Sequence, residues 1–441
     1  MTDLFIKIAD KLGLTLQPKR VDENDYTNTE NLSISAMLSD RLSTLTLTDS
    51  TIAINGDSAR AKFLNDFATR FWNESIKMAC VTSLGTGDCL LKPSTDGKHF
   101  AVDIIGNSDF SITEYIGSYV YGMLIKCDEI KQGNSWYQRV EYHRIREVDG
   151  VSCCHIYQMA FKNGKEVPLS SVDAWAEFPP EIIIPNVDRL LLGRIKSPVK
   201  NRTAPNSPNG VPITYGLDNV VFNVKDAYQR FNKEYRDKET LIFADKSMFK
   251  KDENGETYIP KGKSNLFMKF RSGNIDNSNI DTFSPEIRDT SLDNGIERNF
   301  RMLEMGVGLG EGVLSKSTLT YTNVDEVRAS RSATYAFMTN FRKSIDQAAA
   351  DLLYAVNVLC NANNITPLGS YKFVSDWSDT YITTTQETFN ELLQCVNIDA
   401  VSKAELRSWV MNEDMQVSEE KIAEMEKNNP PTMEMVTVPA D

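Results

Sequence analysis

The segment Cys153-Cys154-His155 contains side chains that could bind a metal ion through thiolate and imidazole. Adjacent cysteines rarely bind one tetrahedral ion, and no second Cys/His pair lies at ligand spacing. A β-strand with a buried thiol is therefore the favoured interpretation. The chain has three histidines (His99, His143 and His155), which leaves few candidates for a catalytic triad.

Glycine stands at every second position of Gly306-Val307-Gly308-Leu309-Gly310-Glu311-Gly312, a pattern that could belong to a nucleotide site. A dinucleotide-binding motif counted from Gly308 would need a third glycine at Val313 and a strand before the run, and neither condition holds. Gly262-Lys263-Ser264 is similar to the end of a phosphate loop, but Thr257 stands where its first glycine is needed. The glycine run and the Ser/Thr-rich residues 315–322 therefore predict a flexible, mobile loop.

Paired carboxylates are a third possible site, since Asp376 and Asp379 flank Trp377 and could hold a cation. A solvated turn is the favoured interpretation of this segment. No enzyme motif is recognised along the chain, so we expect no catalytic residue, no metal and no cofactor. A cellular enzyme is the least favoured class.

Composition bounds the remaining classes of protein. The 441 residues carry 48 Lys plus Arg against 61 Asp plus Glu, a net charge of -13, which excludes a basic nucleic-acid-binding surface over the whole protein. The sequence has no apolar run long enough to span a bilayer and no secretory signal at its start. The seven widely spaced cysteines predict reduced thiols, so we expect a soluble protein made in a reducing compartment.

The periodicity of apolar residues predicts an α+β chain of several packed units. A helix over 59–80 precedes a β-hairpin near 89–104 and antiparallel strands over 110–178, and a proline-rich crossing follows at 197–212. The next elements are a helix over 216–239, a small β-rich insert over 241–284, a returning helix over 286–305, and the glycine run. A helix about 55 Å long begins at the N-cap Asn323 with Glu326, and a strand near 371–374 and three short helices over 386–427 complete the chain.

The β-rich insert has a local basic excess within an acidic chain. Seven basic residues stand against three acidic ones over 246–271: Lys246, Lys250, Lys251, Lys261, Lys263, Lys269 and Arg271. A solvated face of a small β unit is one interpretation. Docking to an acidic partner or to a nucleic-acid phosphate backbone is the other.

The order of these elements resembles that of the portal proteins of tailed bacteriophages, specifically siphophages of Gram-positive hosts, from about residue 63 to residue 427. Local matches occur in the same order: Gly87-Asp88 before 89–92; Tyr137, Arg139, Glu141 and His143; Asn206–Gly210 with Ile213 and Tyr215; Asp399 with Ser402–Arg407; and Ser418–Glu420. One departure is Asn323-Val324-Asp325-Glu326, where the family often opens its long helix with an Ala-Thr-Glu type sequence. The capping pattern survives that change.

The resemblance implies a portal fold that forms a ring of about twelve subunits. Its parts would be an α/β wing (1–215), stem helix 1 (216–240), a clip (241–284), stem helix 2 (285–305), a tunnel loop (306–322), a long helix with the return to the wing (323–383), a crown (384–428) and a disordered tail (429–441). The ring would be the DNA channel at one capsid vertex, through which the genome is packaged and ejected. Another phage head or head–tail connector structural protein is the alternative.

The family also implies partners and contact residues. The partners would be further copies of the chain, the major capsid and scaffolding proteins, the terminase motor, a head–tail adaptor and double-stranded DNA bound without sequence preference, with no membrane. The location would be the virion, after assembly in the host cytoplasm. We expect the glycine loop and Lys316 to approach DNA, the basic clip residues to dock partners, and Tyr335 and Phe337 to supply part of the subunit interface.

Overall fold

The computed structural model describes residues 33–237, 241–245, 267–270, 280–283, 288–316, 324–377, 385–398, 400–411 and 413–428. The α-helices are α2 (Ile34–Leu47), α3 (Ala59–Glu74), α4 (Ile76–Thr86), α5 (Asp218–Asp237), α6 (Asp289–Val307), α7 (Val324–Ala362), α8 (Thr385–Asn397), α9 (Lys403–Met411) and α10 (Met415–Asn428). The strands are β1 (Thr51–Asn55), β2 (Asp88–Thr95), β3 (Phe100–Gly106), β4 (Phe110–Ile116), β5 (Tyr119–Gln132), β6 (Ser135–Val148), β7 (Val151–Lys162), β8 (Lys165–Val167), β9 (Glu181–Pro185), β10 (Gly193–Lys196), β11 (Leu241–Asp245), β12 (Phe267–Phe270), β13 (Ile280–Phe283) and β14 (Lys372–Asp376). The predicted α+β class is confirmed.

The long helix α7 is the centre of the main hydrophobic core. Its 39 residues make it about 58 Å long, and the predicted apolar stripe (Met338, Phe341, Ile345, Ala348, Leu352 and Val356) is buried. It packs against β10, β2, α2 and α3. Phe337 is only 9% exposed and belongs to the same core, so its predicted place in a subunit interface is wrong.

Antiparallel strands form the other large layer, in the order β4-β5-β6-β7-β8 with β9 also pairing β7. These strands confirm the predicted antiparallel β region. They are longer than the strands predicted from the alternation of apolar and polar residues. The predicted hairpin is β2 with β3, closed by a turn at Asp96-Gly97, and β10 adds to its other edge. A single helix over 59–80 is wrong in detail, because the helical path breaks at Ser75 (φ −124°) between α3 and α4.

Two segments far apart in the sequence also meet, since β1 pairs with β14 across more than 300 residues. Helix α2 and strand β1 precede α3 in the described part of the chain. The C-terminal helices α8, α9 and α10 pack together, and Ser402 with Glu405 forms the predicted capping box (Glu405 N to Ser402 Oγ, 3.1 Å; Ser402 N to Glu405 Oε2, 2.6 Å).

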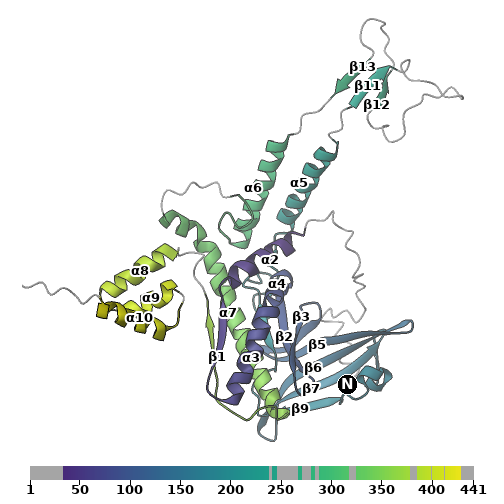
Figure 1. Ribbon diagram of the computed structural model, residues 1–441. Helices are drawn as coiled ribbons and strands as arrows, with labels where there is room; N and C mark the ends of the chain where they lie inside the picture. Colours follow the sequence, from purple (N-terminus) through teal and green to yellow (C-terminus); the bar gives the residue numbers. More distant parts are fainter. Residues whose placement is uncertain are drawn as a thin grey trace, which may run out of the picture.

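Helices α5 and α6 pack side by side and project from the α/β body, with the small sheet β12-β11-β13 at their far end (Figure 1). We call α5, this sheet and α6 the projecting hairpin. The predicted helix, β insert and returning helix are confirmed, although α6 continues two residues past the expected end. Among the described helices, none has the length and apolar character to cross a membrane.

Candidate functional site

The glycine run lies where the projecting hairpin rejoins the body, and its first part is an ordered turn. Gly306 is inside the last turn of α6, and Gly308 ends the helix in the left-handed conformation (φ 88°, ψ 33°). Leu309 N donates to the Glu304 carbonyl at 2.8 Å and Gly308 N to the Met305 carbonyl at 3.1 Å, which is a Schellman cap. The predicted flexible loop is therefore wrong over 306–316, and residues 317–323 lie outside the described part.

Residues 308–316 form what we call the base turn, which Glu304 holds in place. Glu304 is buried, with an exposed fraction of only 1%. Its carboxylate accepts hydrogen bonds from Leu314 N (2.5 Å), Ser315 N (2.9 Å) and Ser315 Oγ (2.7 Å). Backbone amides that would otherwise be buried without a partner are satisfied by one side chain.

The remaining glycines each have a separate structural role. A Cβ on Gly306 would lie 2.7 Å from Leu217 Cδ2, so the absence of a side chain lets α6 approach the start of α5. Gly310 N donates to Thr334 Oγ1 of α7 at 2.9 Å, and Gly312 adopts φ 95°. The alternation of glycines thus reflects a cap, a close contact and a tight turn.

Lys316, the residue expected to approach phosphate, lies at the exposed end of the base turn. Its Nζ is 2.9 Å from Asp293 Oδ2 and its backbone N donates to Glu297 Oε2 at 2.7 Å, both on α6. The hydrogen bond to Asp293 raises the pKa of Lys316. In this conformation the ammonium is paired within the chain.

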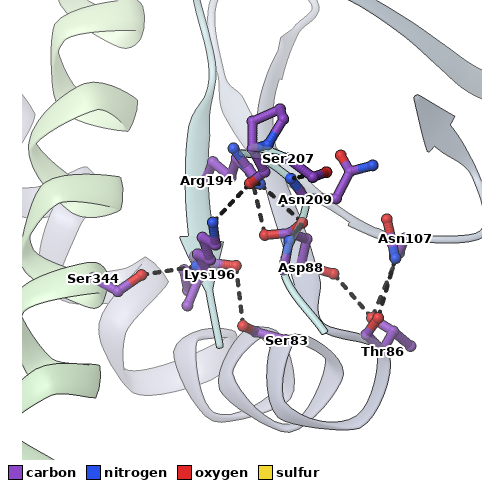
Figure 2. Close-up of polar contacts among 12 residues, drawn as sticks. Ser83, Thr86, Asp88, Asn107, Arg194, Lys196, Ser207, Asn209 and Ser344 are labelled. Carbon is purple, nitrogen blue, oxygen red and sulfur yellow. Dashed lines mark hydrogen bonds and ion pairs between the residues drawn. The ribbon is translucent and has the colours of Figure 1, made fainter. Parts of the chain in front are cut away.

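A second buried carboxylate fixes the other connection of the hairpin, the crossing that leads into α5 (Figure 2). Asp88, at the start of β2, is completely buried. Its carboxylate accepts from Gly210 N at 2.5 Å and forms an ion pair with Arg194 Nη2 of β10 at 2.9 Å. Arg194 and Lys196 also donate to the Pro208 carbonyl, at 2.6 and 2.8 Å. Burial raises the pKa of Asp88 although Arg194 and Gly210 oppose that shift.

The backbone around Asp88 approaches the crossing at a distance that only glycine permits. A Cβ on Gly210 would lie 2.1 Å from the Gly87 carbonyl oxygen, and one on Gly87 (φ 102°) would lie 2.7 Å from the Gly210 carbonyl. Two of the local sequence matches, Gly87-Asp88 and 206–210, are therefore in direct contact. The two connections of the projecting hairpin are each fixed by a buried carboxylate.

Sequence reasoning did not identify Glu304 or Arg194, and it noted Asp88 only as part of a local match, without a role for its carboxylate. For Glu304 a signal existed, since it stands four residues after Phe300 on the apolar face of α6 and should therefore be buried. For Asp88 the sequence signal is weak: it is an aspartate directly after a glycine at the start of a strand.

The predicted docking residues fall mostly outside the described part: Lys246, Lys250, Lys251, Lys261, Lys263 and Arg271. Lys269 lies on β12, where it is paired with Ala244 of β11. Its sheet stands at the far end of the hairpin (Figure 1), whereas Lys316 contacts Asp293 and Glu297 along α6. Asp379, Asn323 and 429–441 also lie outside the described residues.

The residues considered first for chemistry lie on or near the antiparallel sheet. Cys153 and Cys154 are buried in β7, and His155 Nδ1 lies 3.1 Å from Glu181 Oε1. Burial raises the pKa of Cys154 to about 11 and that of Cys127 to about 12, so these thiols stay protonated at neutral pH, whereas attack and metal binding need the thiolate. Within the described ranges no group of three or more His, Cys, Asp or Glu side chains could hold a metal ion.

A buried charge cluster lies on one face of this sheet, centred on Glu141 of β6. Its carboxylate contacts Arg139 Nη1 (2.6 Å), His143 Nε2 (2.8 Å) and Lys92 Nζ (3.3 Å). Burial alone would raise the pKa of Glu141, but the hydrogen bond with His143 and the charges of its neighbours hold it well below the usual range. The cluster is a compensated ion network that joins β2 to β6.

Two buried carboxylates fix a projecting helical hairpin at its base, against a core organised around α7. The chain matches no protein-family model and no curated protein.

Proposed function

We propose that this chain is a portal protein, a subunit of the ring-shaped DNA channel at one capsid vertex of a tailed bacteriophage. The observation that carries the proposal is the projecting hairpin: two packed helices with a three-stranded sheet at their far end, followed by the base turn, the long helix α7 and a helical C-terminal unit. These elements follow the order expected for stem, clip, tunnel loop, long helix and crown. In this proposal the protein is not an enzyme.

The fixed base of the hairpin supports a mechanical role. DNA moving through a channel would push on the hairpins, and each hairpin can resist only if both of its connections to the body are stiff. Asp88 and Glu304 supply that stiffness through buried charge-assisted hydrogen bonds, which are stronger than neutral ones.

Ring closure needs two different contact faces on each subunit, because a closed ring of identical subunits uses a head-to-tail interface. Among the described residues, large apolar side chains are exposed on several elements, and two of these groups lie on the hairpin and on the C-terminal helices. They are Phe222 (67%), Met302 and Met305 (74%) on the hairpin, and Trp409, Val410 and Met411 on α9. We assign these groups to contacts between neighbouring copies.

The charge distribution supports a channel through which DNA slides. The net charge of -13 disfavours tight binding to phosphates. The pairing of Lys316 with Asp293 keeps that cation from acting alone at the base turn. For Lys316 to contact DNA, as the family resemblance implies, this exposed pair must first separate.

The clip sheet would dock the terminase motor during packaging and the head–tail adaptor afterwards, with Lys269 among the docking residues. The capsid and scaffolding proteins would contact the wing and the outside of the ring during assembly in the host cytoplasm. DNA would pass through without sequence preference, and no cofactor is needed for any of these roles.

The test is the mass of the purified protein in solution, followed by negative-stain images of the same fraction. About twelve copies of the 49.7 kDa chain would weigh roughly 600 kDa and show a central hole. A monomer or dimer that stays so after addition of a scaffolding protein would refute the proposal. A closed ring that binds neither motor nor adaptor would favour another head or connector component.

A further inference from the structure

A cavity of about 560 Å³ lies between β5, the segment 188–196 and α7. Its size is within the range of small-molecule sites, which are mostly apolar with a few placed polar groups. The apolar part of its lining includes Val120, Met123, Leu190 and Leu192. Two cations that also line it, Arg194 and Lys196, lie side by side (Figure 2).

The charges around the cavity are unequally compensated. Arg189 has two carboxylates, Asp188 and Asp351, at 3.0 and 3.1 Å. Arg194 uses Nε and Nη2 on Asp88 and Pro208, and no described residue bonds its Nη1. Asp88 is thus in direct contact with Arg194, while it attracts Lys196 without an ion-pair contact.

Lys196 is the one of these three cations that has no described carboxylate in ion-pair contact. Its Nζ donates to the Pro208 carbonyl at 2.8 Å, and none of the carboxylates in the described residues lies within 4.0 Å of it. Burial, together with the charge of Arg194, lowers the pKa of Lys196, although the charge of Asp88 opposes that shift. A half-buried ammonium in this setting is stabilised when an anion binds beside it.

We propose that this cavity binds a small organic anion, a carboxylate or phosphate monoester carried on an apolar body. The anionic group accepts hydrogen bonds from Lys196 Nζ and Arg194 Nη1. The apolar body lies on Met123, Leu190 and the side chains beside them. The site is formed within one chain, so the proposal does not depend on whether the chain forms a ring.

Calorimetric titration of the full chain with phenyl phosphate and with phenylacetate tests the proposal. We expect saturable binding of at least one of them, at one molecule per chain, with weaker binding of inorganic phosphate and none of benzyl alcohol. Lys196→Gln keeps a polar side chain without the charge and should weaken binding by about tenfold or more. Lys200→Gln is the matched control, because Lys200 is exposed four residues further on and should leave affinity unchanged.

A second variant fills the cavity without altering the cations. Gln347 lines it from the exposed side of α7, so Gln347→Trp should abolish binding while circular dichroism stays unchanged. If Lys196→Gln does not fold, the titration of Gln347→Trp tests whether the anions bind in this cavity. Failure of both aryl anions to bind at about 10 mM, or equal affinities in Lys196→Gln and Lys200→Gln, would overturn the proposal.

Discussion

Replacing Glu304 by alanine removes the acceptor that fixes the base turn. Three donors lose their partner: the amides of Leu314 and Ser315, and the Ser315 hydroxyl. A buried donor left unpaired costs roughly 1–3 kcal/mol. The hydroxyl can rotate and Leu314 is only half-buried, so water can reach part of the group. We therefore expect the free energy of local opening of the base turn to be about 3 kcal/mol lower in the variant than in wild type.

Hydrogen exchange followed by mass spectrometry measures this local opening directly. A change of about 3 kcal/mol corresponds to exchange faster by about a hundredfold in peptides that cover 308–316. Peptides from β5 to β7 should be unaffected, because their hydrogen bonds do not involve Glu304. Glu311→Ala is the matched control, since Glu311 is exposed on the same turn.

Two results would refute the reasoning. One is exchange over 308–316 within about threefold of wild type in Glu304→Ala, which would mean that the turn is held by its backbone cap alone. The other is equal acceleration in Glu311→Ala. If hydrogen exchange in Glu304→Ala is faster in all peptides, the same measurement on Glu304→Gln distinguishes local opening from global unfolding. The glutamine retains one acceptor oxygen.

Three further predictions concern the body that carries the hairpin. A Cβ on Gly193 would lie 2.3 Å from the Ala348 carbonyl oxygen, so Gly193→Ala should lower the free energy of unfolding by about 2–3 kcal/mol in urea titration; an unchanged midpoint would mean that β10 and α7 are not in close contact. Asp88→Asn leaves the Arg194 guanidinium without its counter-ion and should cost about 3–5 kcal/mol, and clearly less in an Arg194→Met background; equal costs in both backgrounds would contradict the ion pair. The pKa of Glu141 is lower in the native state than in the unfolded chain, so its carboxylate contributes stability in full above pH ~4.3 and loses it as pH falls through the native pKa. The difference in unfolding free energy between wild type and Glu141→Gln should therefore shrink in acid, and a difference independent of pH would argue against the cluster.

The sequence predicted the elements where apolar spacing repeats over many residues. The stripe from Met338 to Val356 identified α7 and its buried face, and the Ser402 and Glu405 pair identified the cap of α9. The Asp96-Gly97 turn identified the hairpin of β2 and β3. In each case the pattern is local, because helix and strand periods and caps involve residues only a few positions apart.

Prediction failed where one segment of the chain is shaped by another. The glycine run was interpreted as a mobile loop, yet Gly308 is a helix cap and Gly306 allows contact with Leu217. Phe337 was assigned to a subunit interface because it lies beside the main stripe, and the core of this chain buries it. Both outcomes depend on which surface packs against the residue.

By itself the sequence determined the α+β class, the order of helices and strands, and the helix–insert–helix segment on which the portal proposal depends. Only the tertiary structure decided that Gly87, Asp88 and Gly210 meet across more than 120 residues, and that Glu304 points back to hold the turn that follows it. The physical reason is that secondary structure follows from local backbone preferences and the period of burial. Close backbone approach and buried charge depend instead on partners that are distant in the chain and become neighbours only when the core has packed.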